Sequence, residues 1–238
     1  MNPSVLVTGG ARRIGRRICE VLSQSGWNVV IHSRGKDDAD AAELAGRLHS
    51  PRVWGDLGDE REVRRIFENA AGAAPSLCAV VNNASVFSVA SVLGAEETAK
   101  IRNVNFASPV LLTELLHGKC AQEKISAAAV NLLDTRILPP ASAKTPYEKS
   151  KFDLFAYTRE AAKKFAPVLR VNAVAPGPVL APPDPSSSEK GGATLLANRP
   201  SSGDIANAVL FLLNAGAVTG ETIAVDSGQH LISGEIVR

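Results

Sequence analysis

The chain has 238 residues, of which 45% are hydrophobic and 21% are charged, as is ordinary for a globular protein of one domain. A formal net charge of +2 gives no reason to expect a nucleic-acid partner. No run of about 18 apolar residues occurs, and the scattered cysteines and histidines form neither a disulfide framework nor a metal site. We therefore expect a cytoplasmic protein without a metal, a membrane span or a signal peptide.

Apolar segments alternate between two periodicities along the chain. Short apolar runs that end in turn residues predict strands in residues 4–10, 27–33, 52–57, 77–85, 126–134, 169–179 and 221–228. Helical spacing of apolar residues predicts helices in residues 13–26, 37–50, 59–73, 99–118, 146–166 and 202–216. Strands that are apolar on both faces belong to a parallel sheet with helices on both sides. The sequence thus predicts one α/β domain over residues 1–238, built on a Rossmann-type, doubly wound parallel sheet.

The ends of the predicted strands carry most of the polar candidates. A sheet of this kind binds ligands outside the carboxyl ends of its strands. The segment 182–193, PPDPSSSEKGGA, leaves one of these ends and is rich in proline, serine and glycine. Such a composition predicts a mobile loop, and we expect the segment around residues 180–200 to cover the ligand.

A glycine-rich turn, TGGARRIG in residues 8–15, follows the first strand and opens a helix. Glycines let the backbone approach a pyrophosphate, and the helix N-terminus supplies amide donors. Arg13 lies in this turn, where it would add a positive charge beside the phosphates. The alternative is a solvated arginine on the first turn of the helix.

The next two strand ends indicate which dinucleotide binds. The second strand ends in His32, Ser33 and Arg34, without the acidic residue that usually holds the ribose of NAD. Arg34 with Ser33 can hold a 2′-phosphate, which favours NADP(H) over an ordinary polar strand end. After the third strand, Asp56 could accept from the adenine amino group beside Leu57, although a helix N-cap explains this aspartate equally well.

Two further motifs complete the pattern. NNAS, residues 82–85, ends the fourth strand with small and amide side chains that let the chain pass close to a cofactor. Tyr147 and Lys151 are four residues apart on a predicted helix and therefore share one face. The lysine ammonium would favour loss of the tyrosine proton and could also hold the nicotinamide ribose.

The order and spacing of TGGARRIG, NNAS, Asn105, YEKSK, NAVAPGPV and VTGETIAVDSG resemble the short-chain dehydrogenase/reductase family across the whole chain. Within the family, the chain is similar to the pteridine reductase and dihydromonapterin reductase branch. Four positions carry this similarity: Arg13 in the glycine turn, Ser85 where most members have glycine, Phe87, and Asp134 where most have serine. The resemblance implies NADPH as cofactor, a pterin substrate and assembly as a homotetramer.

The resemblance also implies roles for individual residues. Catalytic roles fall to Asp134, Tyr147, Lys151 and Asn105, the last as an extension of a proton relay through water. Contacts with the substrate are implied for Arg13, Ser85, Phe87, Asp134 and Tyr147. Contacts with the cofactor are implied for Gly9, Arg13, Ile14, Gly15, His32, Ser33, Arg34, Asp56, Leu57, Asn83, Ala84, Lys151, Pro176, Gly177 and Val179.

Asp134, thirteen residues before Tyr147, bears on the choice of reaction. A carboxylate there would repel the alkoxide formed from a ketone, whereas a carboxylic acid can protonate a ring nitrogen. The preceding apolar strand, SAAAVNLL, would favour the protonated form, so reduction of a carbon–nitrogen double bond is favoured. The alternative for Asp134 is a turn acid before a loop.

A flat pterin could lie between the nicotinamide and Phe87, in an offset stack worth about 0.5–1.5 kcal/mol beyond burial. The alternative for Phe87 is a core or lid residue. The sequence therefore predicts NADPH-dependent reduction of a dihydropterin to its tetrahydro form. Two alternatives are a ketone reductase of the same family and a non-catalytic regulatory protein that binds NADP(H), although the intact set of Asn105, Tyr147 and Lys151 speaks against the second.

Overall fold

The structure is a computed structural model that describes residues 2–138, 143–179 and 194–232. Its strands form one parallel sheet in the order β3-β2-β1-β4-β5-β6-β7, which confirms the predicted doubly wound fold. The strand order runs outward from β1 to β3 on one side of the sheet and from β4 to β7 on the other. The boundary between β1 and β4 is therefore the switch point where such sheets bind ligands. The strands are β1 Ser4–Val7, β2 Asn28–Ser33, β3 Arg52–Trp54, β4 Leu77–Asn82, β5 Ala127–Leu132, β6 Leu169–Pro176 and β7 Thr222–Val225.

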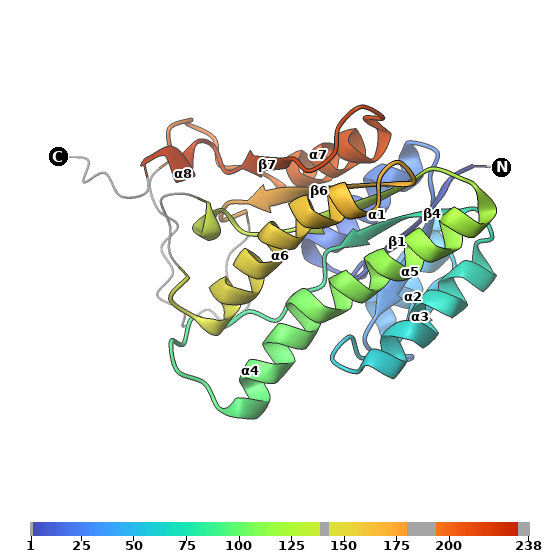
Figure 1. The fold of residues 1–238 in the computed structure, drawn as a ribbon, viewed down its shortest axis with the longest axis horizontal. Coiled ribbons are helices and arrows are strands. Elements are labelled where there is room, and N and C mark those ends of the chain that lie inside the picture. The colour runs from blue at the N-terminus through green and yellow to red at the C-terminus, as the bar shows by residue number, and fades with distance from the viewer. Residues whose placement is uncertain (1, 139–142, 180–193, 233–238) are drawn as a thin grey trace.

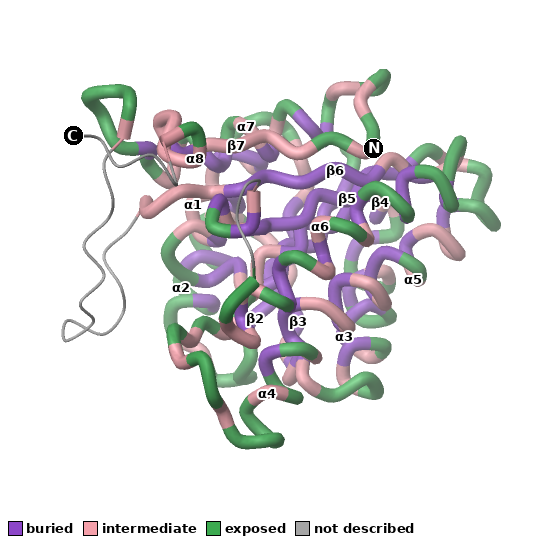
Figure 2. The backbone as a smooth tube through the Cα atoms, turned by 60° about the vertical axis from the view of Figure 1, so that its left-hand side comes forward, coloured by how far each residue is buried: buried purple, intermediate pink, exposed green. Residues whose placement is uncertain are grey.

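Helices cover both faces of the sheet (Figure 1). Alternate residues of β1 face opposite cores: Leu6 packs among side chains of α3, α5 and α6, whereas Val5 and Val7 pack among those of α1, α2 and α7. Figure 2 shows the buried strands in the middle of the molecule and the exposed residues on the outer turns. The helices are α1 Arg13–Gln24, α2 Ala39–Leu48, α3 Glu60–Ala73, α4 Ala95–Arg102, α5 Ser108–Glu123, α6 Pro146–Lys164, α7 Ser202–Asn214 and α8 Gln229–Ile232.

The helical segment predicted in residues 99–118 is longer and less regular than expected. Helix α4 begins at Ala95, after Gly94 as N-cap, with Glu96 and Glu97 in its first turn. It continues through the π-helical turn η1, Asn103–Ala107, into α5. The prediction missed four residues at the start, although acidic residues in a first turn are a recognised start signal. The π turn places Asn105 at a bend of the helix, as is frequent at functional sites.

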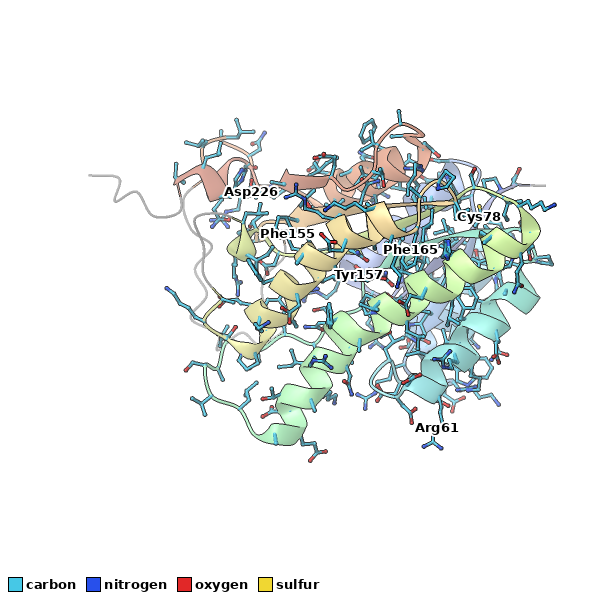
Figure 3. All side chains as sticks on the ribbon, in the orientation of Figure 1. Arg61, Cys78, Phe155, Tyr157, Phe165 and Asp226 are labelled. Atoms are coloured by element: carbon cyan, nitrogen blue, oxygen red, sulfur yellow. The ribbon has the colours of Figure 1, made fainter. Side chains whose placement is uncertain are left out.

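Helix α6, which carries Tyr147 and Lys151, is fixed at its start and along its length. The side chain of Thr145 accepts from the Glu148 N–H in a capping box, and Pro146 occupies the first turn. Figure 3 shows Tyr157 and Phe165 between α6 and α5; the Tyr157 hydroxyl donates to the Val110 carbonyl at 3.4 Å. These contacts fix the first turn of α6 and hold the helix against α5.

Other sequence expectations concern the chain as a whole. None of the described helices is both long and apolar enough to cross a membrane. Cys19 and Cys120 are buried and Cys78 is partly buried, all as free thiols. The predicted mobile loop of residues 182–193 lies outside the described residues, so it stays a prediction.

Candidate active site

A cavity of about 340 Å³ opens at the carboxyl ends of β1, β4, β5 and β6. It therefore lies at the switch point of the sheet. Many of the predicted site residues line it: Arg13, Ile14, Asn83, Ser85, Phe87, Asp134, Tyr147, Lys151, Pro176, Gly177 and Val179. Its wall also contains residues that the sequence analysis did not single out: Leu132, Leu133, Arg136 and Pro178. The remaining predicted residues lie outside this wall: Gly9, Gly15, His32, Ser33, Arg34, Asp56, Leu57, Ala84 and Asn105.

The glycine turn has the close packing that an approach to a diphosphate requires. Gly9 has a positive φ of 60°, and a Cβ atom on Gly15 would lie only 2.1 Å from the Gly9 carbonyl oxygen. Helix α1 has no acidic residue in its first turn and no side-chain cap among the described residues. Its first N–H groups can therefore meet an anion, so the residues present fit a dinucleotide cofactor.

Side chains at the end of β4 hold this turn in place. The Asn83 side-chain amide donates to the carbonyls of Thr8, at 2.9 Å, and Gly9, at 3.1 Å. In return, the Thr8 hydroxyl accepts from the backbone N–H groups of Asn83 and Ala84, both at 3.0 Å. Sequence reasoning missed Thr8, although its place directly before the glycines was the available signal.

The His32 side chain also holds the glycine turn in place. Its Nδ1 accepts from the Gly9 N–H at 3.1 Å, and its Nε2 lies 3.1 Å from the Gly55 carbonyl, to which it donates in the neutral tautomer. Burial lowers the pKa of His32 to about 4, against the opposing effect of the Gly55 hydrogen bond, so the ring is neutral at pH 7. Both ring nitrogens are thus engaged by backbone groups. The His32 ring therefore positions the glycine turn, and its contact with the cofactor stays a prediction.

The arginines around the turn have different surroundings. Arg13 lines the cavity and has a positive φ of 52°, a strained conformation for a residue with a side chain. Arg12, Arg16 and Arg17 lie outside the cavity wall and form ion pairs with acidic residues, namely Glu20, Asp38, Asp40 and Glu43. Of this group, Arg13 is therefore the one placed to contact a ligand in the cavity.

The ends of β2 and β3 lie next to the glycine turn. The Arg34 side chain is 73% exposed, and its Nε is 3.4 Å from Asp56 Oδ2. Asp56 Oδ1 also accepts from the Gly58 N–H at 2.8 Å, so it serves as a turn acid whether or not it contacts adenine. Ser33 donates to the Gly35 carbonyl, and Leu57 is buried in the core. Arg34 is thus an exposed cation at this end of the site.

Arg34→Ala is expected to weaken NADPH binding by about 1.5–3 kcal/mol, the scale of a charge-assisted hydrogen bond, and to leave NADH binding almost unchanged. The reason is that the two cofactors differ only in the 2′-phosphate. Titration of both cofactors into the parent protein and the variant measures this difference. Equal affinity of the parent protein for NADPH and NADH would contradict the assignment.

Asp134, Tyr147 and Lys151 meet at the wall of the cavity. The Tyr147 hydroxyl donates to Asp134 Oδ2 at 2.9 Å. The Lys151 ammonium donates to the Leu132 carbonyl at 2.8 Å and lies 5.8 Å from the centre of the Tyr147 ring. The carboxyl and the phenol can therefore exchange a proton directly, with a cation close to both.

The surroundings of Asp134 differ from the apolar pocket that the sequence led us to expect. The strand before it is buried, but Asp134 Oδ1 accepts from the Arg136 N–H at 2.9 Å and lies 3.7 Å from the Arg136 Nε. Asp134 thus has Arg136 as a polar neighbour that the sequence analysis did not consider, and its role as a protonated acid stays a prediction.

Lys151 is almost fully buried, and burial lowers its pKa to about 8, a shift that the nearby Asp134 carboxylate partly opposes. The ammonium form therefore prevails at pH 7, and Lys151 loses its proton near pH 8. A lysine of this kind can support proton movement at Tyr147.

Asn105 has no free hydrogen-bonding capacity on its side chain. Its Oδ1 accepts from the Val86 N–H at 2.7 Å and from the Ser85 hydroxyl at 3.2 Å. Its Nδ2 donates to the Val86 carbonyl at 2.9 Å and to the Ser150 hydroxyl at 3.1 Å. The side chain thus joins the segment after β4 to helix α6. A relay of protons through water by this side chain stays a prediction.

Phe87 stands at the wall of the cavity between two partners. The Phe87 ring meets the Tyr147 ring edge-on, with 4.8 Å between the two centroids. The Arg136 guanidinium carbon lies 5.0 Å from the Phe87 centroid. Phe87 is 40% exposed, so the ring is accessible to a ligand. A flat heterocycle could therefore pack on it.

Comparison with known proteins identifies the class. The family profile described as "Enoyl-(Acyl carrier protein) reductase" matches residues 9–230. The chain therefore belongs to the short-chain dehydrogenase/reductase family, and it is an oxidoreductase.

The relatives of the chain include a member of the branch that the motifs indicated and a carbonyl reductase. This chain is 28% identical to dihydromonapterin reductase of Citrobacter koseri, over 95% of this chain and 96% of the relative. It is 29% identical to carbonyl reductase family member 4 of Danio rerio, over 98% of this chain and 100% of the relative.

Two solved structures resemble the chain over most of their length. FolM alternative dihydrofolate reductase 1 from Brucella suis, in complex with NADP, has 31% sequence identity and a TM-score of 0.85, with 96% of this chain and 95% of that chain covered. The Brucella canis protein, also complexed with NADP, has 32% identity and the same TM-score, with 97% and 95% covered. Both contain the cofactor that the sequence predicted for this chain.

Proposed function

We propose that this chain reduces a dihydropterin to its tetrahydro form with NADPH. The observation that carries the proposal is the 2.9 Å hydrogen bond between Tyr147 and Asp134 at the cavity wall. A ring nitrogen that becomes protonated needs a group that can give up a proton, and a carboxyl–phenol pair can do so. A ketone reductase instead needs neutral donors around a developing alkoxide.

The residues around the cavity divide the work of binding. The glycine turn and Arg13 would hold the diphosphate, Arg34 the 2′-phosphate and Lys151 the nicotinamide ribose. When bound, NADPH supplies a hydride. Phe87 would support the pterin ring, with Ser85 and Arg13 as polar contacts. Leu132, Leu133 and Val179 provide apolar wall that displaces water from the reacting atoms.

Names of relatives support two different substrates. Dihydromonapterin reductase and the FolM reductases support a pterin. Carbonyl reductase family member 4, at a similar identity, supports reduction of a ketone as the second candidate. The carboxyl at Asp134 favours the pterin.

Oxidation of NADPH, followed by its absorbance, distinguishes these possibilities. We expect turnover with dihydrobiopterin, dihydromonapterin or dihydrofolate, and little with a panel of ketones that includes a 3-oxoacyl thioester. Ketone turnover without pterin turnover would select the carbonyl reductase. Tight binding of NADPH without oxidation by any substrate would indicate a binding protein.

Assembly as a homotetramer is a prediction from the family resemblance alone. Light scattering of the purified protein would measure its mass against the 24.9 kDa of one chain.

A further inference from the structure

Arg136 is a cavity residue to which the sequence analysis gave no role. It lies in the short 3-10 turn η2, Thr135–Ile137, which directly follows Asp134. Its guanidinium carbon is 5.0 Å from the centre of the Phe87 ring, and its Nε is 3.7 Å from Asp134 Oδ1. The side chain is 36% exposed. It is therefore both held by neighbours and open to a ligand.

Stacking and pairing reduce the freedom of this guanidinium before any ligand arrives. A planar guanidinium that is already oriented loses less entropy for each hydrogen bond that it forms to a ligand. It also favours carboxylates, which it can bind through two parallel hydrogen bonds. Arg136 thus presents a preorganised positive charge at the Phe87 wall.

The other charges of the cavity lie elsewhere. Arg13 borders the glycine turn, and Lys151 is buried beside Tyr147 and bonded to the Leu132 carbonyl. Both lie where the proposed cofactor would bind. Asp134 is the acidic residue among the described wall residues. It accepts hydrogen bonds from the Tyr147 hydroxyl and from the Arg136 backbone N–H. A ligand ring packed on Phe87 would have Arg136 as its neighbouring cation, because the guanidinium carbon is 5.0 Å from the Phe87 centroid.

We propose that Arg136 is a specificity-determining residue that favours dihydropterins whose side chain carries a carboxylate over those with a neutral side chain. This inference rests on the proposed function, because it concerns the substituent of the same pterin. A purely structural Arg136, which only keeps Phe87 against Tyr147, would affect all pterins alike. The two roles are separated by comparing two substrates in one variant.

The experiment compares kcat/KM for dihydrofolate, which has carboxylates, with kcat/KM for dihydrobiopterin, which has none. In Arg136→Met, which keeps an unbranched side chain but removes the charge, the ratio of the two values should fall by roughly fivefold to twentyfold, mainly through KM for dihydrofolate. Arg136→Lys keeps the charge and should retain most of the ratio. Raising the salt from about 0.05 M to about 0.5 M should reduce the ratio in the parent protein but not in Arg136→Met.

Lys163→Met provides a control of equal charge change. Lys163 is 74% exposed and lies near the end of α6, about 24 Å along the helix from Tyr147. Lys163→Met should leave the ratio of the two kcat/KM values unchanged. An unchanged ratio in Arg136→Met, with both pterins still reduced, would overturn the inference while the proposed function stands. No turnover of dihydrofolate, dihydrobiopterin or dihydromonapterin by the parent protein would instead overturn the proposed function.

Discussion

Asp134→Asn is expected to lower kcat for a dihydropterin by about 10²–10⁴, the usual contribution of general acid catalysis, with little change in NADPH affinity. Asparagine keeps the shape of the side chain and can still hydrogen-bond to Tyr147 and to the Arg136 N–H. It cannot exchange a proton through the 2.9 Å contact with Tyr147. Steady-state kinetics with dihydrobiopterin, together with NADPH titration, measures both quantities.

The pH profile gives a second measurement of the same change. Because Asp134→Asn removes one of the two groups that can exchange a proton at this wall, the kcat–pH profiles of the parent enzyme and the variant should differ in shape. Asp134→Ser should rebuild the arrangement of a ketone reductase and raise any weak carbonyl activity. Nearly full pterin turnover by Asp134→Asn, with an unchanged pH profile, would show that Asp134 is only a turn acid.

Lys151→Met is expected to stabilise the cofactor-free protein at pH 7 while it lowers kcat by at least about 10². Burial lowers the pKa of Lys151 from 10.5 to about 8, so holding the charged form at pH 7 costs roughly 3 kcal/mol. Loss of the hydrogen bond to the Leu132 carbonyl offsets part of the gain, which leaves roughly 1–3 kcal/mol. Urea unfolding without cofactor measures this difference.

The dependence on pH identifies the cause. Between pH 8 and 10.5 the folded parent protein has released the Lys151 proton while the unfolded chain still holds it, so its stability rises with pH across this window. The advantage of Lys151→Met should therefore shrink from pH 8 and vanish near pH 10.5. Lys149 lies on the same helix and is 65% exposed. Lys149→Met should therefore change stability and activity much less than Lys151→Met does. A constant advantage at every pH would point to packing instead of charge.

The architecture could be predicted because periodicity and turn residues are local signals. Every predicted strand and helix is present, with ends that differ by a few residues. The motif residues at the strand ends converge on one cavity because the carboxyl ends of parallel strands share an edge of the sheet. That convergence follows from topology, so one correct fold prediction placed distant residues such as Arg13 and Tyr147 together.

Side-chain partnerships were harder to predict, because they depend on three-dimensional neighbours. Arg136 follows Asp134 in a turn that has no periodic pattern, and its stacking on Phe87 joins segments that follow different strands. His32 ends a strand, where a ligand contact was a reasonable expectation, but its ring faces backbone groups of two neighbouring turns. The π-helical turn at Asn105 depends on backbone register, for which the sequence offers no marker.

The ion pairs beside the glycine turn bear on how the protein selects among anions in a cell. An unpaired group of arginines would attract nucleic acids, polyphosphates and cofactors alike over long distances. Acidic partners, including the short contact between Arg12 and Asp40, cancel most of that field beyond a Debye length. Affinity then depends mainly on short-range contacts with the turn and Arg13, which only a ligand of the right shape can make. Abundant polyanions would therefore compete poorly with a dinucleotide for this turn.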